Sequence, residues 1–116
     1  MQVSWKEHLG RKYLYCDLSN SNAAESIKLA DEIITQLGTS DEQVLFLANV
    51  ENAVISTEFM EKAKVNGKLF QHKIIKSAVV GISGLKKILI KSYIAFTGSR
   101  FALFNSEEEA LKYLFE

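Results

Sequence analysis

The sequence predicts an α/β fold in which a mostly parallel sheet of about five strands is combined with about four helices. Short apolar runs, near residues 12–18, 43–49 and 74–82, alternate with longer segments whose apolar residues recur at helical spacing. Chain order is the second observation, because strands that alternate with helices are joined by right-handed crossovers that leave neighbouring strands parallel.

An N-terminal hairpin is expected over residues 1–18, where apolar and polar residues alternate. Gly10 lies in the turn at residues 9–11 and supplies a backbone angle that other residues rarely adopt. Because a hairpin joins antiparallel strands, the sheet is expected to be antiparallel at this edge. The polar residues 19–22 then end the second strand.

The first helix is expected over residues 22–37. Asn22 and Glu25 have the spacing of a capping box, in which each side chain bonds the backbone N–H of the other residue. Apolar residues follow at helical spacing. Gly38 is expected to end the helix, since glycine readily adopts the left-handed conformation that often follows a helix.

The middle of the chain predicts a further strand–helix unit and then another strand. Residues 43–49 are almost continuously apolar, which is typical of a strand covered on both faces. A second helix is expected to begin at Ser56–Thr57, and Gly67 predicts a kink or an early end because glycine weakens a helix interior by about 1 kcal/mol. The strand at residues 74–82 is rich in Ile and Val and is expected to end at Ser83–Gly84.

The C-terminal third predicts a helix over residues 85–97, a short strand over 101–104 and a last helix over 107–115. Ser106 precedes three glutamates and forms a capping-box pattern with the last of them. The helix over 85–97 is apolar on two sides, which favours a contact with something else and is compatible with a homodimer.

The composition is that of one globular domain, residues 1–116, with 47% apolar and 24% charged residues. Cys16 is the only cysteine, so no disulfide can form within the chain, and we expect a buried, inert thiol. No signal peptide is recognisable, which predicts a cytoplasmic location. No apolar run approaches the roughly 18 residues that span a bilayer, so we expect no membrane span.

Charge is distributed unevenly although the net charge is zero. From Lys62 to Arg100 there are nine lysines and arginines and no acidic residue, whereas acidic residues gather at 31–61 and 107–109. This asymmetry predicts one positive and one negative face, with two ordinary solvated faces as the alternative. No motif that reads nucleic acid accompanies the basic stretch, so we expect no nucleic-acid partner.

Polar side chains follow the predicted strands at the place where ligands bind open parallel sheets, beyond the carboxyl ends of the strands. The candidates are Asp17, Ser19, Asn20, Asn49 and Glu51. Neither Asp17 nor Glu51 has a clear partner for acid–base catalysis, so no catalytic constellation is recognised. No His/Cys cluster has zinc spacing, and we expect neither a metal nor a cofactor. The alternative is that these residues only cap helices and solvate turns.

The segment Gly81-Ile-Ser-Gly-Leu-Lys-Lys87 joins a strand, a glycine turn and a helix start that carries two lysines. Unpaired backbone N–H groups at a helix start favour anions, and lysines add positive charge. Ser83, Gly84, Lys86 and Lys87 are therefore candidate anion-binding residues, with a tight strand-to-helix turn as the alternative. The spacing is not that of a P-loop, and the hydroxyl that would hold magnesium is absent.

Three segments carry a resemblance to a known fold. They are Tyr13-Leu-Tyr-Cys-Asp-Leu-Ser19, Lys76-Ser-Ala-Val-Val-Gly-Ile-Ser-Gly-Leu-Lys-Lys87 and Phe104-Asn-Ser-Glu-Glu-Glu-Ala-Leu111. With the element order, they make nearly the whole chain resemble the anti-sigma factor antagonist fold, also called the STAS or SpoIIAA-like fold. That fold is a strand–helix superhelix shared with CRAL/TRIO lipid-transfer domains. More closely, the chain is similar to small bacterial proteins of unknown function that are grouped with STAS domains.

The resemblance implies a regulatory module that binds a protein partner. True antagonists carry a phosphorylatable serine at the start of the second helix, within an Asp-Ser-Ser-Gly motif. The matching stretch here is Ile55-Ser56-Thr57-Glu58, which keeps both hydroxyls, with Thr57 at the phosphorylated position, and lacks the Asp and the Gly. Glu58 would repel an adjacent phosphate, and simple helix capping is the alternative role of Ser56 and Thr57.

Two other functions stay open at this point. The protein could sense a small molecule or a lipid, using apolar helix faces around Ile90, Ile94 and Phe96 and an anion site at residues 81–87 for the head group. It could also be an enzyme that uses Asp17 or Glu51. The partner is therefore expected to be a protein or a small anionic or lipid ligand.

Overall fold

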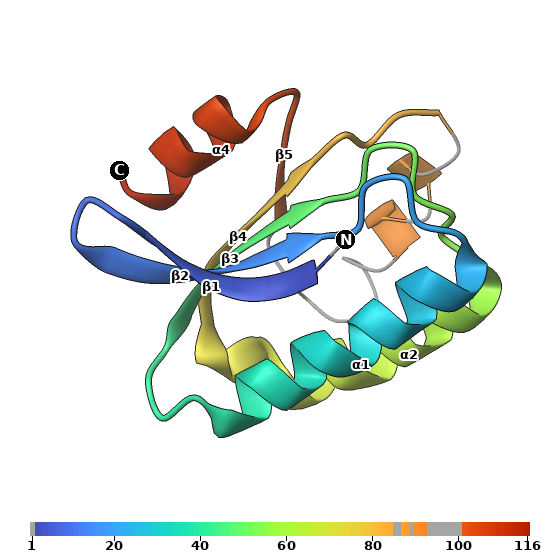
Figure 1. Cartoon of the computed structure of the whole chain (residues 1–116), viewed down its shortest axis with the longest axis horizontal. Coiled ribbons are helices and arrows are strands. Elements are labelled where there is room, and N and C mark those ends of the chain that lie inside the picture. Colours follow the sequence, from blue (N-terminus) through green and yellow to red (C-terminus); the bar gives the residue numbers. More distant parts are fainter. Residues whose placement is uncertain (1, 85–86, 89, 93–100) are drawn as a thin grey trace.

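The computed structural model describes residues 2–84, 87–88, 90–92 and 101–116, whose elements follow the predicted order (Figure 1). The strands are β1 (Gln2–His8), β2 (Arg11–Asp17), β3 (Val44–Asn49), β4 (Ile74–Val80) and β5 (Phe101–Phe104). The helices are α1 (Ala23–Thr39), α2 (Thr57–Phe70) and α4 (Glu107–Leu114), and the 3₁₀ helix η1 (Gln71–Lys73) follows α2 directly. Residues 87–88 and 90–92 are also helical. The rest of the helix predicted over 85–97, with Lys86, Ile94 and Phe96, lies outside the described residues.

The five strands form a single mixed sheet in the order β1-β2-β3-β4-β5. β1 pairs antiparallel with β2, and the pairs β2–β3, β3–β4 and β4–β5 are all parallel. Helices α1 and α2 cover one face of this sheet, and α4 lies on the other (Figure 1). The structure thus confirms the predicted parallel sheet with an antiparallel hairpin at its edge.

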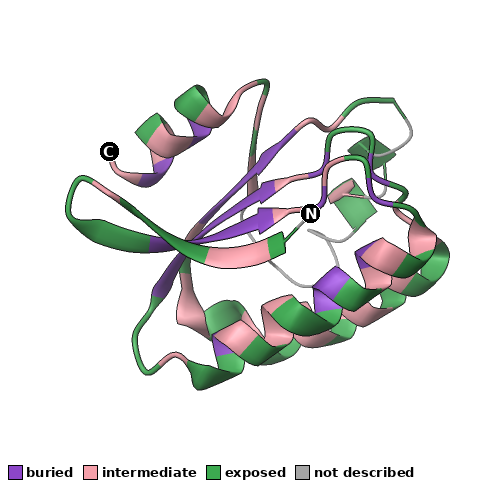
Figure 2. Cartoon of the chain, in the orientation of Figure 1, coloured by how far each residue is buried: buried purple, intermediate pink, exposed green. Residues whose placement is uncertain are grey.

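The hydrophobic core has two layers, one on each face of the sheet. Alternate residues of β2 and β3 point to opposite faces, so Leu14 and Phe46 pack toward α1 and α2, while Tyr15 and Leu47 pack toward α4. Buried residues therefore run along the central strands (Figure 2). The prediction of a strand covered on both faces at residues 43–49 is confirmed, since β3 is buried from Val44 to Ala48.

Side-chain caps fix where the helices begin. At α1, Asn22 accepts a hydrogen bond from the Glu25 N–H at 2.9 Å, and the Glu25 carboxylate accepts one from the Asn22 N–H at 3.0 Å, which confirms the capping box. At α4, Ser106 Oγ accepts a hydrogen bond from the Glu109 N–H at 3.2 Å. Each such cap contributes about 1 kcal/mol.

Glycines end the elements less often than the sequence predicts. The prediction at Gly38 is wrong, because α1 continues to Thr39 and the extended Ser40 caps it by donating its N–H to the Leu37 carbonyl. Gly67 does not end α2, which runs to Phe70. The cost of glycine in a helix, about 1 kcal/mol, is small beside the burial that a helix gains by packing on a sheet.

The predicted end of the third parallel strand is also corrected. β4 stops at Val80, and Gly81 turns the chain with φ of 88°, ahead of the expected break at Ser83–Gly84. A β-carbon on Gly81 would lie 2.8 Å from backbone atoms of Glu51, so the turn is set by close contact with the neighbouring loop. The residues around Gly81 in the sequence do not reveal this contact with Glu51, so the end of β4 could not be predicted from them.

Candidate functional site

The loops that follow β2, β3 and β4 lie together at the carboxyl edge of the sheet, and backbone hydrogen bonds join them. Leu18 donates its N–H to the Asn49 carbonyl, Asn20 to the Glu51 carbonyl, and Val50 to the Val80 carbonyl, each at 2.9 Å. The structure therefore brings the loop of Asp17, Ser19 and Asn20 next to the loop of Asn49 and Glu51.

The polar side chains of these loops bond to their own backbone. Asp17 Oδ1 accepts hydrogen bonds from the Ser19 N–H at 3.0 Å and from Ser19 Oγ at 2.5 Å. Asn49 Oδ1 accepts the Glu51 N–H at 3.0 Å. Burial raises the pKa of Asp17, but the two Ser19 hydrogen bonds and the charge of Lys6 outweigh it and lower the pKa overall. A carboxylate with a lowered pKa is a weak general base.

Glu107 of α4 contacts the same edge of the sheet from the opposite face to α1. Its Oε2 accepts hydrogen bonds from the Tyr15 hydroxyl at 2.7 Å and from Asn49 Nδ2 at 3.1 Å. Burial, followed by the hydrogen bond and negative charge of Glu107, raises the pKa of Tyr15 well above its usual range. From the sequence, Glu107 is expected only at the start of a helix, whereas in the structure its contact also holds α4 on β2 and β3.

The turn after β4 presents its polar groups to solvent. Ser83, Gly84 and Lys87 are exposed, and the Lys87 N–H donates to the Gly84 carbonyl at 3.1 Å, which begins a helical turn. Lys86 lies outside the described residues. Among the described members of this group, no side chains converge on a common point, so anion binding there stays a prediction.

The start of α2 carries the two hydroxyls that the resemblance singled out. Ser56 is the N-cap, and its Oγ accepts a hydrogen bond from the Phe59 N–H at 3.1 Å. Thr57 occupies the first helical position and is exposed. The two hydroxyls are therefore unlike in environment, and phosphorylation of either is a prediction.

Two lysines of the basic stretch, Lys73 and Lys76, bond to backbone carbonyls. Lys73 Nζ donates to the carbonyls of Leu37 and Ser40, both at 3.0 Å, at the end of α1. Lys76 Nζ donates to the Tyr113 carbonyl at 3.1 Å, at the end of α4. Cations at helix C-termini are stabilised by the helix dipole, so part of this charge serves the fold.

An apolar cavity of about 120 Å³, partly open to solvent, lies between the sheet and the helices α1 and α2. Its wall includes Ile33 and Leu37 of α1, Ala63 and Asn66 of α2, and Phe46 and Val79 of the sheet. Among the described residues that line it, Asn66 has the only polar side chain. The apolar pattern of the sequence does not predict this cavity, because the apolar faces of two helices show the same pattern whether the space between them is filled or hollow.

Within residues 2–84, 87–88, 90–92 and 101–116, no group of three His, Cys, Asp or Glu residues is placed to hold a metal ion. In the same part of the chain, no helix is long and apolar enough to cross a membrane.

An antiparallel hairpin followed by parallel strand–helix units, with helices on both faces, defines the SpoIIAA-like class of α/β folds. The chain is similar to the crystal structure of an uncharacterised protein of the DUF3478 family from Shewanella loihica PV-4, which has a SpoIIAA-like fold. The TM-score is 0.70 at 15% identity, over 97% of this chain and 91% of that one. No family model and no curated protein matches the sequence. The SpoIIAA-like fold is therefore confirmed, and at this identity the likeness concerns the fold alone.

Proposed function

We propose that this protein binds a small apolar ligand in the cavity between the sheet, α1 and α2. The observation that supports it is the cavity itself, about 120 Å³ in volume and walled almost entirely by apolar side chains. Protein interiors have few voids larger than a water molecule. An engineered apolar cavity of about 150 Å³ stays dry and binds benzene or xenon, so a ligand no larger than benzene is expected here.

A bound ligand is expected to stabilise the folded protein. A ligand that fills this apolar space binds the folded form and not the unfolded chain, so the bound form would be measurably more stable than the free form.

This proposal takes up the small-molecule alternative of the sequence analysis and drops its anionic head group. Among the described residues lining the cavity there is no lysine or arginine, and the turn at residues 81–87 is not needed to hold the ligand. We propose that residues 1–116 form one domain that binds this ligand in the cytoplasm.

The test is benzene binding to the native protein and to two matched variants. Ala63→Leu places a larger side chain in the cavity wall, whereas Ala24→Leu makes the same change at an exposed site in the first turn of α1. Binding is followed by methyl NMR shifts and by the rise of Tm with benzene concentration. We expect the native protein and Ala24→Leu to bind, and Ala63→Leu to lose binding while gaining about 0.5–2 kcal/mol of stability.

Two outcomes would contradict the proposal. Native protein whose Tm and methyl shifts do not respond to benzene has no ligand site of this kind. Equal binding by Ala63→Leu and the native protein would place the ligand outside this cavity.

A protein-interaction module is the second candidate, and the surface around the start of α2 favours it. Val54, in the loop before the helix, is 48% exposed, and Thr57, at the first helical position, is also exposed. Both side chains are accessible to a protein partner, and they lie in the region that the resemblance to STAS domains singles out. Co-purification from source cells tests this: Thr57→Trp should lose partners that the matched surface variant Lys28→Trp retains. An unchanged partner set with Thr57→Trp would exclude this surface.

A further inference from the structure

The structure assigns to the cavity a selectivity for neutral ligands that carry one hydrogen-bonding group, with Asn66 as the residue that recognises this group. The inference rests on the proposed function and concerns the chemical class of the ligand. Alcohols, ketones and esters belong to that class, whereas carboxylates and amines that are charged at neutral pH do not.

The position of Asn66 on α2 is the first support. Phe59, Ala63, Asn66 and Phe70 are separated by four, three and four residues, so they form one stripe along the helix, and all four line the cavity. An amphipathic helix normally has apolar residues along such a stripe. Asparagine is also a poorer helix former than leucine. Neither helix propensity nor packing against the sheet accounts for an amide at this position.

The hydrogen bonding of the Asn66 amide is the second observation that supports this inference. The Asn66 side chain is half-buried, and no hydrogen bond joins it to a described residue. Its amide keeps contact with water, since Ser4 Oγ alone is a fully buried, unpartnered side-chain oxygen or nitrogen among the described residues. A carboxamide offers two donors and one acceptor, so Asn66 is available to bond the hydroxyl or carbonyl group of a ligand in the cavity.

The described residues that line the cavity include no charged side chain, and this limits the charge of the ligand. A carboxylate or an ammonium group placed there would lose its hydration without gaining an opposite charge. The volume of about 120 Å³ limits the ligand further, to about five or six non-hydrogen atoms. The expected ligand is therefore a small neutral amphiphile.

A cycle of two ligands and two proteins tests the assignment. Pentane and 1-butanol have the same number of non-hydrogen atoms and differ in one hydroxyl, while Asn66→Leu keeps the side-chain size and removes the amide. The dissociation constants are measured by methyl NMR titration. We expect the preference for 1-butanol over pentane to fall by about two- to tenfold in Asn66→Leu, the range of a single hydrogen bond. Asn105→Leu, an exposed site before α4, should retain the native preference.

The outcomes separate this inference from the proposed function. If pentane binds and the preference is the same in Asn66→Leu as in the native protein, the role of Asn66 is overturned while the cavity remains a ligand site. If butanoate binds as tightly as 1-butanol, the selectivity for neutral ligands is overturned. If the native protein binds neither pentane nor 1-butanol nor butanoate, the proposed function fails and this inference with it. Should Asn66→Leu not fold, Asn66→Ala replaces it in the same cycle.

Discussion

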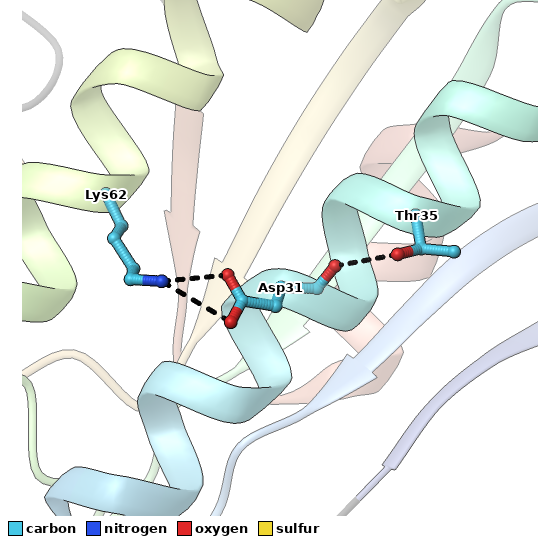
Figure 3. A network of polar contacts seen from close by, with 3 residues as sticks. All are labelled: Asp31, Thr35 and Lys62. Atoms are coloured by element: carbon cyan, nitrogen blue, oxygen red, sulfur yellow. Dashed lines mark hydrogen bonds and ion pairs between the residues drawn. The ribbon is translucent and has the colours of Figure 1, made fainter.

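Lys62 of α2 and Asp31 of α1 form an ion pair that joins the two helices of the cavity wall (Figure 3). The Lys62 Nζ lies 3.1 Å from Oδ1 and 3.4 Å from Oδ2 of Asp31. Thr35 bonds the backbone carbonyl of Asp31, so it does not compete for the carboxylate. The side chains of Lys62 and Asp31 are 38% and 60% exposed, which places the pair at the solvent surface.

Removing this ion pair should weaken the fold slightly and in a salt-dependent way. Lys62→Gln is expected to lower the free energy of unfolding by about 0.2–1 kcal/mol, the range measured for exposed pairs. The loss should shrink in 1 M salt, where the screening length is about 3 Å. Urea denaturation at low and high salt measures both quantities. Lys28→Gln removes an exposed lysine of α1 as the control, and equal losses for the two variants would show that the pair contributes nothing.

The burial of Tyr15 and its hydrogen bond to Glu107 predict an alkaline limit to stability. Because the pKa of Tyr15 is raised in the folded state, its contribution is complete below the usual value of 10.0. It is lost as the pH rises above that value, where the unfolded chain releases a proton that the folded chain retains. The buried Cys16 acts in the same direction from its usual value of 9.0 upward. Stability should therefore fall above about pH 9–10.

Variants at the two residues identify the source of that fall. Tyr15→Phe and Glu107→Gln should each make the loss of stability with pH shallower. The first removes the phenol, and the second removes the charge that adds to the effect of burial on the pKa of Tyr15. Urea midpoints from pH 8 to 11, with phenolate absorbance as a second signal, measure the slope. A slope unchanged in both variants would mean that the alkaline loss arises elsewhere.

The elements that the sequence predicts well are those whose signals are local. The capping pair Asn22 and Glu25 and the apolar run of β3 each depend on neighbours in the chain, and each appears in the structure as expected. The strand order was not predictable, because it depends on contacts between distant strands. The end of α1 was misplaced for a related reason, since Lys73 bonds the Leu37 carbonyl at that end and lies far along the sequence.

The candidate site was less accessible to prediction than the fold. Tyr15 and Glu107 are 92 residues apart, and each has a sufficient local explanation, one as a strand residue and one at a helix start. The cavity depends on how closely α1 and α2 approach the sheet, which no pattern of apolar residues specifies. One usable signal was present: Asn66 interrupts the apolar stripe of α2.

The contact between Gly81 and Glu51 provides a matched pair of glycines for the last prediction. Gly81 and Gly84 both have left-handed backbones, with φ of 88° and 57°. An alanine at either position would adopt a conformation that costs about 1–2 kcal/mol. At Gly84 the new methyl group would meet no atom within 4 Å, whereas at Gly81 it would lie 2.8 Å from the backbone nitrogen and α-carbon of Glu51.

Gly81→Ala should therefore destabilise the protein by at least about 1 kcal/mol more than Gly84→Ala, because the loop after β3 has to move to relieve the overlap. Urea denaturation of the two variants measures the difference, and amide shifts of residues 49–53 report whether that loop moves. Equal losses would mean that only backbone strain matters at Gly81. A larger loss confined to Gly81→Ala, with shifts at Glu51, would show that close contact between the two loops fixes the end of β4.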